Sequence, residues 1–226
     1  MAKPPVALDF MLLFASSVHD IKNSLNLLLQ GLHGVAARLD DDAASTELRA
    51  LTQHGHHISE ELTRLLTLYR LNQVGHYPLD VREHWLSEFL AEHTVLLQQQ
   101  CQAQNVTLHI DCPDDLQGFF DGQLIATVIA DAVYNALRGC QQHIEICAVS
   151  HRRGVLITVE DDGSGYPAEI LAIQGQHSVP SQHGSGLGLF FAATVAQLHR
   201  NRDEVGALIL DNQSRWGGAR LQLFLP

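Results

Sequence analysis

The stretch Val155-Leu-Ile-Thr-Val-Glu-Asp-Asp-Gly-Ser-Gly165 joins an apolar run to two adjacent carboxylates and two glycines. Its first residues are mostly β-branched or apolar, which is typical of a buried strand. The glycines let the backbone after the strand come close to a planar ligand, and a carboxylate there can accept hydrogen bonds from an exocyclic amine. The stretch therefore predicts a strand that ends in a ligand-binding loop.

Two further motifs flank this one, which is the second of three along the chain. The first precedes the strand, in an apolar segment that predicts a helix over Asp121–Leu137. Asp131 and Asn135 are four residues apart and share one helix face, with Arg138 three residues further along. An amide oxygen and a carboxylate on one face can hold Mg²⁺ or its waters, and a guanidinium beside them can pair with phosphate. The segment is a candidate for metal and phosphate binding.

A third motif, Gly184-Ser-Gly-Leu-Gly-Leu189, opens a helix predicted over Leu187–His199. The free N–H groups and the positive dipole end of a helix N-terminus suit a phosphate. A lone glycine-rich loop is as often a simple turn, and the strand, glycine loop and acidic residue of a dinucleotide site are not arranged that way here. All three motifs in one order, with about eighteen residues between the second and third along the chain, favour a nucleotide site.

The remaining elements predicted in this half alternate irregularly between helix and strand. The expected helix is Trp85–Gln100, and the further expected strands are Val106–Asp111, His143–Val149, Ala207–Asn212 and Ala219–Leu225. Strands interleaved with helices in this way predict an α/β sandwich with helices on one face of a mixed sheet.

The first third of the chain carries two apolar series that alternate in steps of four and three. They run through Phe14, Val18, Ile21, Leu25, Leu28, Leu32, Val35 and Leu39, and through Leu48, Leu51, Gly55, Ile58, Leu62, Leu65 and Tyr69. Such heptads predict two long helices, which the acidic turn Asp40–Asp42 joins into an antiparallel hairpin. One hairpin cannot bury both sides of these series, so two copies are expected to form a four-helix bundle in a homodimer.

The heptad pattern breaks at Gly75–Pro78. We therefore place a domain boundary there, with a helical hairpin domain over residues 1–75 and an α/β domain over residues 76–226.

Composition narrows the classes of partner. The formal net charge is −11, which disfavours nucleic acid or an anionic membrane surface as the main partner. The apolar stretch Val6–Val18 is interrupted by Asp9, is too short to span a bilayer and lacks the features of a signal peptide. We expect a cytoplasmic protein with no membrane span.

Cysteine and histidine usage adds no clear metal or disulfide framework. The four cysteines are Cys101, Cys112, Cys140 and Cys147. They form no CxxC pair, which agrees with a reduced protein. The group His54, His56 and His57 raises the alternative of a metal site, but no ligand spacing supports it, and solvated helix-surface histidines are favoured.

Taken together, the three motifs resemble those of the GHKL ATPase superfamily, and specifically of histidine kinases. Asp131–Arg138 resembles their N box, Val159–Gly165 their G1 box and Gly184–Leu189 their G2 box. The resemblance implies an α/β sandwich that holds ATP between helices and a mobile lid, here roughly Tyr166–His183.

The resemblance also implies roles for single residues. Asp161 would accept a hydrogen bond from the adenine amino group, Asn135 would ligate Mg²⁺, and Arg138 stands where the family usually has a phosphate-contacting lysine. The other implied ATP-binding positions are Asp131, Gly163, Gly165, Gly184, Gly186 and Gly188.

The N-terminal stretch Ser17–Leu25 resembles the H box of the same family, in a His-Asp-x-Lys-Asn form. The heptads give an independent reason to look here. Val18 and Ile21 belong to the apolar series, which leaves His19 one step away and facing solvent. An imidazole in that position can act as a nucleophile toward a γ-phosphoryl group.

In the mechanism that the resemblance implies, His19 takes the phosphoryl group of ATP and Asp20 acts as its base. An aspartate on the receiver domain of a separate response regulator then takes the group from His19. Asn23 resembles the residue that orients a water in family members that dephosphorylate the regulator, so a phosphatase activity is a second expectation. Any signal would arrive through a separate sensor protein, a ligand of the two domains, or redox or pH chemistry.

Three departures from the family pattern keep other functions open. Ser24 replaces the usual proline, Asp131 replaces the first asparagine of the N box, and the lid has no lysine or arginine. One alternative is a non-catalytic phosphotransfer or scaffold protein with a degenerate ATP-binding fold. Another is a serine/threonine kinase of the anti-sigma type, against which the hairpin with His19 argues.

Overall fold

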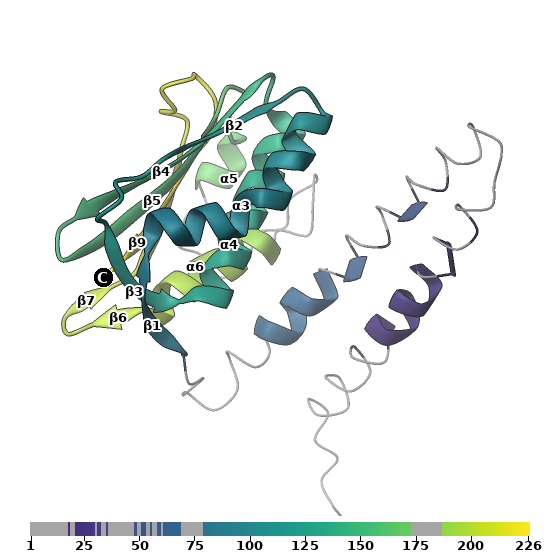
Figure 1. Cartoon of the computed structure of the whole chain (residues 1–226), viewed down its shortest axis with the longest axis horizontal. Helices are drawn as coiled ribbons and strands as arrows, with labels where there is room; N and C mark the ends of the chain where they lie inside the picture. The colour runs from purple at the N-terminus through teal and green to yellow at the C-terminus, as the bar shows by residue number, and fades with distance from the viewer. Residues whose placement is uncertain are drawn as a thin grey trace, which may run out of the picture. The chain divides into compact units, whose positions relative to one another are not determined.

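The chain divides into two compact units, Met1–Tyr77 and Pro78–Pro226. The structure, a computed structural model, describes residues 79–172 and 187–226 in full (Figure 1). In the first unit it describes residues 18, 21–29, 31–32, 35, 48, 51–52, 55, 58–59 and 61–68, all of which are helical.

Within the first unit, two contacts join the earlier helical residues to the later ones. Ser59 Oγ donates a hydrogen bond to Asn26 Oδ1 at 3.1 Å. A Cβ added at Gly55 would collide with the side chain of Leu29. Asn26 contacts Ser59, whereas Leu29, further along the first helical stretch, contacts Gly55, which comes earlier in the second. Antiparallel packing produces contacts in this opposite order.

The second unit is built on a five-stranded sheet with the order β2-β4-β5-β9-β8. Its strands are β2 (Thr107–Asp111), β4 (His143–His151), β5 (Gly154–Asp161), β8 (Ala207–Asp211) and β9 (Arg220–Leu225). β2 pairs with β4 in parallel, and the other pairs are antiparallel. The predicted mixed sheet is confirmed.

Three helices cover one face of this sheet: α3 (Leu86–Ala103), α4 (Gly122–Gly139) and α6 (Leu187–Leu198) (Figure 1). Every second residue of β4 and β5 points into the core under them. The buried strand residues include Ile144, Ile146, Ala148, Val155, Ile157 and Val159, and the helices add Leu86, Leu90, Ile125, Val133, Phe191 and Val195. The predicted sandwich, with helices on one face, is therefore confirmed.

Four short strands and one short helix were not predicted. β1 (Val81–Trp85) pairs with β3 (Gln117–Asp121), β6 (Arg200–Asn201) pairs with β7 (Glu204–Val205), and α5 is Ala168–Ala172. These segments are short and largely polar or exposed, so no apolar period marks them. β1 is held by its pairing with the distant β3, and β6 is held by its pairing with β7 across a tight turn.

In the described part of the chain, no helix combines the length and the hydrophobicity needed to cross a bilayer. Nor does that part contain a group of three histidine, cysteine or acidic side chains that could hold a metal ion. His54, His56 and His57 lie outside the described residues.

Candidate functional site

The first motif occupies the second half of α4. Asp121 caps this helix, because its Oδ1 accepts the Leu124 N–H at 3.2 Å. Within the helix Asp131 is buried, Asn135 is half-buried and Arg138 is exposed. The predicted residues therefore lie at increasing distance from the core, along one side of the helix.

Arg138 and Asn135 contact each other directly. Arg138 Nη2 donates to Asn135 Oδ1 at 2.7 Å. This amide oxygen is the atom expected to ligate a metal, so the guanidinium and a cation would compete for it. Arg138 would have to turn away before Asn135 could bind Mg²⁺, and its exposure leaves it free to turn.

Asp161, the last residue of β5, has a carboxylate that the surrounding backbone holds in place. Its Oδ1 accepts the N–H of Gly163 at 2.8 Å and the N–H of Ala219 at 3.1 Å. Burial raises the pKa of Asp161, and these two N–H groups oppose the shift. Because both bonds use Oδ1, the carboxylate has a defined orientation, and Oδ2 accepts no hydrogen bond from the residues that the structure describes.

The neighbouring carboxylate serves a different purpose. Asp162 Oδ1 accepts the Gln141 N–H at 2.7 Å, and its Oδ2 accepts the Gln142 N–H at 3.0 Å. Burial opposes ionisation, but these bonds and the backbone N–H of His143 hold the pKa of Asp162 below its usual value. Asp162 thus ties the end of β5 to the segment between α4 and β4, whereas Asp161 remains the candidate for ligand recognition.

The glycines of the second motif permit close backbone approaches. A Cβ at Gly163 would collide with the carbonyl oxygen of Gly139, at the end of α4. Gly165 has φ of +79° and lies against the side chain of Asn212. Residues with a Cβ are strained or excluded at both positions, so the glycines bring the loop after β5 onto α4.

Asn212 fixes the chain just beyond Gly165. Its Oδ1 accepts the Tyr166 N–H at 2.6 Å, and its Nδ2 donates to the Tyr166 carbonyl at 3.0 Å. Burial raises the pKa of the Tyr166 phenol, and the carboxylates of Asp161 and Asp211 raise it further, so the hydroxyl stays protonated. The start of the expected lid, which continues into α5, is therefore anchored.

The segment between β8 and β9 supports Asp161 from the other side. Ser214 Oγ donates to the Asp161 carbonyl at 2.7 Å, and the Gly218 N–H donates to the same oxygen at 3.1 Å. A Cβ at Gly218 would collide with Asp161. From the sequence we predicted only the strands that flank this segment, although the adjacent Gly217 and Gly218 were an available signal of a close approach.

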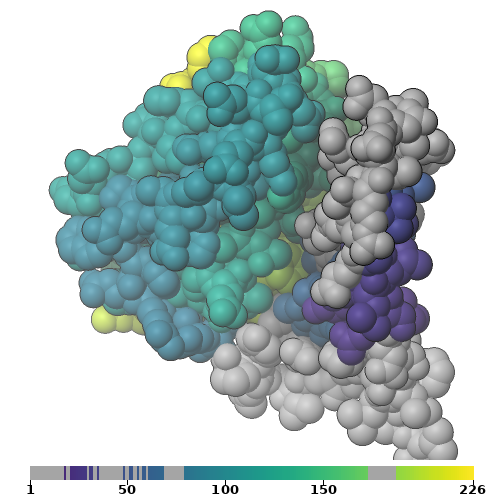
Figure 2. Space-filling view, turned by 45° about the vertical axis from the view of Figure 1, so that its right-hand side comes forward, coloured from purple at the N-terminus to yellow at the C-terminus, as the bar shows by residue number. Residues whose placement is uncertain are grey.

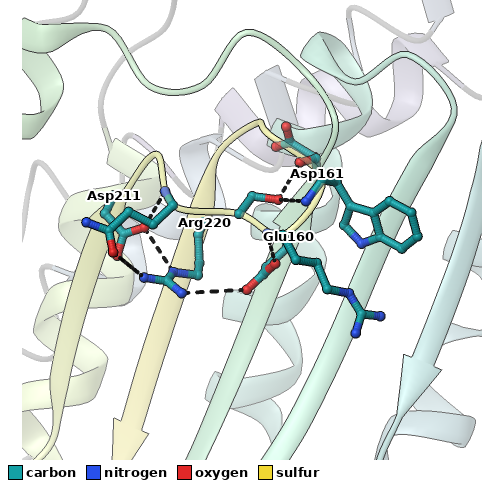
Figure 3. A network of polar contacts seen from close by, with 8 residues as sticks. Glu160, Asp161, Asp211 and Arg220 are labelled. Carbon is teal, nitrogen blue, oxygen red and sulfur yellow. Dashed lines mark hydrogen bonds and ion pairs between the residues drawn. The ribbon is translucent and has the colours of Figure 1, made fainter.

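A polar network on the uncovered face of the sheet holds this segment (Figure 3). Arg220 pairs with Asp211 through two hydrogen bonds of 2.9 Å and lies 4.0 Å from Glu160. Although burial alone would raise it, the Arg220 guanidinium keeps the pKa of Asp211 below its usual value. β8, β9 and β5 are thereby clamped next to the segment that contacts Asp161.

Arg215, within the same segment, makes two further contacts with the sheet. Its backbone N–H donates to Glu160 Oε2 at 2.9 Å, and its guanidinium forms an ion pair with the buried Glu145. Its guanidinium also lies over the ring of Trp216, which stacks on His143 at a ring separation of 5.0 Å. These supporting residues were not predicted from the sequence.

The third motif lies beside the first. A Cβ at Gly188, in the first turn of α6, would lie 3.7 Å from Asp131 Oδ2. The structure thus brings Gly188 to the middle of α4, as Gly163 is brought to its end. Gly184 and Gly186 lie outside the described residues, as do His19 and Asp20. Asn23 is exposed on the helical stretch 21–29.

A buried histidine connects the N-terminal end of α4 to the C-terminal end of α6, away from the motifs. His199 Nδ1 is 2.8 Å from the Val195 carbonyl oxygen, to which it donates, and His199 Nε2 accepts the Asp121 N–H at 3.0 Å. Burial lowers the pKa of His199, although the Asp121 carboxylate opposes the shift. The imidazole is therefore neutral, and it fixes the spacing of the two helices whose motifs meet at Gly188.

Comparisons with known proteins agree with this geometry. Residues 120–226 match the family described as histidine kinase-, DNA gyrase B-, and HSP90-like ATPase. The sensor-type histidine kinase PrrB of Mycobacterium bovis is 40% identical over 104 residues, which are 42% of this chain and 22% of that protein. The sensor protein PhoQ of Escherichia coli is 24% identical over 208 residues, 91% of this chain and 41% of that protein.

Among solved structures, the catalytic domain of histidine kinase ThkA has the same fold. It superposes with a TM-score of 0.56 at 21% identity and covers 66% of this chain and 98% of its own. The chain spans less than half the length of the curated relatives named above. Residues 120–226, within the second unit, are thus similar to the histidine kinase-, DNA gyrase B- and HSP90-like ATPase family, and PrrB, which is similar to part of this chain, is a sensor-type histidine kinase.

Proposed function

We propose that this chain is a histidine kinase of a two-component system, which phosphorylates His19 with ATP and passes the phosphoryl group to a response regulator. One observation carries the proposal. Gly163 contacts the end of α4 and Gly188 lies beside Asp131 in its middle, so the three motifs, though far apart in sequence, border one helix. A nucleotide lying along α4 would meet all three.

Within this site Asp161 would recognise the adenine. The carboxylate is oriented by two N–H groups on Oδ1, which leaves Oδ2 for the exocyclic amine. Such fixed orientation reduces the entropy that binding would otherwise cost. Gly163, Gly165, Gly184, Gly186 and Gly188 would let the backbone approach the nucleotide.

The residues of α4 suit a magnesium-bound triphosphate. The amide oxygen of Asn135 lies one helical turn from the carboxylate of Asp131, and oxygen donors of this kind are the ones Mg²⁺ prefers. When bound, the cation neutralises phosphate charge. The lid Tyr166–His183 contains no lysine or arginine, so Arg138 is the cation we assign to the phosphates.

The chemical step needs a nucleophile with a base beside it. A ring nitrogen of His19 would form the new bond to the γ-phosphorus while the bond to the ADP oxygen breaks, and Asp20 would take the ring proton. An aspartate of the receiver domain would then accept the phosphoryl group. Asn23, exposed four residues after His19, would orient a water for dephosphorylation of the regulator.

The exposure of the first unit supports dimerisation through residues 1–75. In the single chain five apolar residues at one heptad position are exposed to solvent: Ile21 by 54%, Leu28 by 57%, Val35 by 52%, Leu51 by 54% and Ile58 by 51%. Val18, at the other heptad position, is only 4% exposed. A stripe repeating every seven residues fits a second copy. Light scattering should give twice the chain mass, and an Ile21→Glu/Ile58→Glu variant should give the monomer.

Labelling with γ-phosphate-labelled ATP tests the function. The chain should take up an acid-labile label, His19→Ala should lose it while still binding ATP, and His109→Ala, which removes an exposed histidine of β2, should keep it. The loss should be roughly a hundredfold or more. An acid-stable label would instead identify a serine/threonine kinase, and bound ATP without any label would identify a scaffold protein.

The site residues are tested separately. Asp161→Asn should bring the affinities for ATP and GTP closer together, because base recognition is lost. Asn135→Ala should weaken both equally, because charge neutralisation is lost. Asn23→Ala should spare labelling and slow dephosphorylation of the regulator. Unchanged ATP affinity in both pocket variants, measured by calorimetry, would remove the nucleotide assignment.

A further inference from the structure

At the end of the sheet away from Asp161, two hairpin turns bring arginines together. Arg152 and Arg153 form the β4–β5 turn, and Arg202 lies in the β6–β7 turn. A strand of the length of β5 spans about 23 Å, so this end is distinct from the nucleotide motifs. In both overall views the β6–β7 hairpin and the yellow segment between β8 and β9 lie at opposite ends of the domain (Figure 2).

None of these arginines forms a salt bridge with a residue that the structure describes. Among the residues that the structure describes, salt bridges are made by Arg64, Arg82, Arg215 and Arg220, and none by Arg152, Arg153 or Arg202. The chain as a whole has 25 acidic against 14 basic residues. Three guanidinium groups at one end of the sheet that form no salt bridge with a described residue are therefore a local exception, which favours an anionic partner.

The backbone also holds two of the arginines in a costly conformation. Arg152 has φ of +54° and Arg202 has φ of +55°. In the described part of the chain the third such residue that is not glycine is Asn105, a type that tolerates this region. Arg152 and Arg202 each hold the first position of a two-residue hairpin turn, where a positive φ is usual and glycine or asparagine is the common occupant. An uncommon residue at both hairpin tips is a reason to look for a role there.

A cavity of about 230 Å³ lies between these turns and β3. Arg152 and Arg153 line it together with Phe119, Ser150, Gln117 and Asn201. No aspartate or glutamate lines it, and its one anionic group is the main-chain carboxylate of Pro226, the last residue of the sequence. A second cavity beyond it contains Asp203 and Glu204 next to Arg153 and Arg202. The second cavity is therefore balanced in charge, with two arginines and two acidic residues, whereas the lining of the first is net positive and is the better place for an anion.

Phe119 adds an apolar element to the same cavity. Its side chain is 58% exposed, although it belongs to a paired strand. Arg152 is held over the ring of Phe224 at 5.7 Å, which restricts its movement. The site thus offers two arginine forks, which suit carboxylates, beside one exposed aromatic ring.

We propose that this cavity docks a partner protein through an acidic segment that carries one apolar side chain. A carboxylate would bind between Arg152 and Arg153, and the apolar side chain would cover Phe119. The concave shape favours a protruding segment over a flat membrane, and the excess of negative charge on the chain argues against nucleic acid.

The test uses the full chain and a fluorescent peptide of aspartate and glutamate with one central phenylalanine. At roughly 50 mM salt, where screening is weak, anisotropy should show saturable binding, and a peptide with asparagine and glutamine in place of the acids should not bind. Arg152→Glu/Arg153→Glu should weaken binding roughly tenfold or more. Arg82→Glu, which alters an exposed arginine paired with Asp80, should change it less than about twofold.

The contribution of the exposed Phe119 ring to peptide binding is tested with a variant and a matched control. Phe119→Ala should weaken binding several-fold, and Ile209→Ala, which truncates a side chain 46% exposed on β8, should not. Three results would overturn the proposal: no binding of the acidic peptide, an equal loss in the Arg82 variant, or binding of phosphatidylserine vesicles in preference to the peptide. Self-association that the Arg152→Glu/Arg153→Glu change abolishes would also overturn it, because the occupant would then be a second copy.

Discussion

Where β5 ends, Asp161 is buried and its carboxylate accepts two backbone N–H groups. Where β5 begins, Arg152 and Arg153 are exposed and form no ion pair with any residue that the structure describes. Both ends of β5 carry charged side chains, but only at the Asp161 end do backbone N–H groups hold the charged group in place.

The difference follows from the cost of removing charge from water. A buried carboxylate without hydrogen bonds would be expensive, so the fold must supply partners, and these also fix its direction before any ligand arrives. An exposed guanidinium stays hydrated at little cost and keeps its hydrogen bonds for a partner. We therefore expect changes at the Asp161 end to affect stability strongly and changes at the hairpin end to affect it little.

The largest effect should come from Gly218→Ala. The new Cβ would collide with the backbone of Asp161 and with the Gly163 nitrogen, and backbone atoms cannot turn aside. We expect a loss of about 3 kcal/mol in the free energy of unfolding, measured with urea, and at least a tenfold loss of affinity for ATP.

Gly217→Ala is the matched control. Gly217 has φ of +90° but no atom lies within 4 Å of an added Cβ, so only the left-handed conformation is penalised. The cost should be about 1 kcal/mol with unchanged ATP binding. Equal losses of ATP affinity in the two variants would show that Gly218 does not act through Asp161.

An intermediate effect is expected where Arg215 meets Glu145. Arg215→Met would leave the carboxylate of Glu145, only 3% exposed, without its ion pair. Arg215 itself is 55% exposed, so solvent screens the interaction and we expect a loss of about 1–2 kcal/mol. Adding Glu145→Gln should recover part of this loss, since a neutral amide is cheaper to bury.

For comparison, Arg82→Met removes an ion pair with the exposed Asp80. Urea unfolding should show a change within about 0.5 kcal/mol. A cost as large as that of Arg215→Met would contradict the link between burial and stability.

A smaller effect should appear with pH. Since burial lowers the pKa of His199 below 6.5, the folded chain binds fewer protons there than the unfolded chain. The contribution of neutral His199 is therefore complete above pH 6.5 and is lost as the pH falls below it. Urea unfolding at neutral and mildly acidic pH should show a steeper decline for the native chain than for His199→Gln. Parallel declines would assign the acid sensitivity to other groups.

The smallest effect is expected at the hairpin end. Arg202→Gly relieves a left-handed conformation but gives the unfolded chain more freedom, so the two contributions nearly cancel. The free energy of unfolding should change by less than about 0.5 kcal/mol in either direction. A loss above about 1 kcal/mol would mean that Arg202 stabilises the hairpin and would contradict the expectation that changes at this end affect stability little.

Much of the domain could be predicted because its elements repeat a local pattern. β4, β5, α4 and α6 alternate or cycle their apolar residues against one core, and their bounds agree with the prediction to within about two residues. β1 and β3 could not be found this way. Val81 pairs with Asp121, forty residues along the chain, and neither strand carries a long apolar run.

The residues of the candidate site also fall into those that could be recognised from local sequence and those that could not. Glycines at Gly163, Gly165 and Gly188 and the carboxylate of Asp161 were recognisable, since their chemistry and spacing stand out in the sequence itself. The residues that support Asp161 were not recognisable from the sequence. Ser214 and Ala219 contact Asp161 across more than fifty residues, and nothing in their residue types indicates that contact.

The sequence by itself determined the sandwich, the three helices that cover its sheet and the three motifs, because apolar periodicity and glycine-rich loops are local properties. Only the tertiary structure decided that Asp161 is oriented while Asp162 ties two segments together, and that Arg152, Arg153 and Phe119 meet in one cavity. The physical reason is that burial and hydrogen-bond partners depend on which distant segments pack together. The same residue type can therefore be a fixed support at one end of a strand and a free surface group at the other.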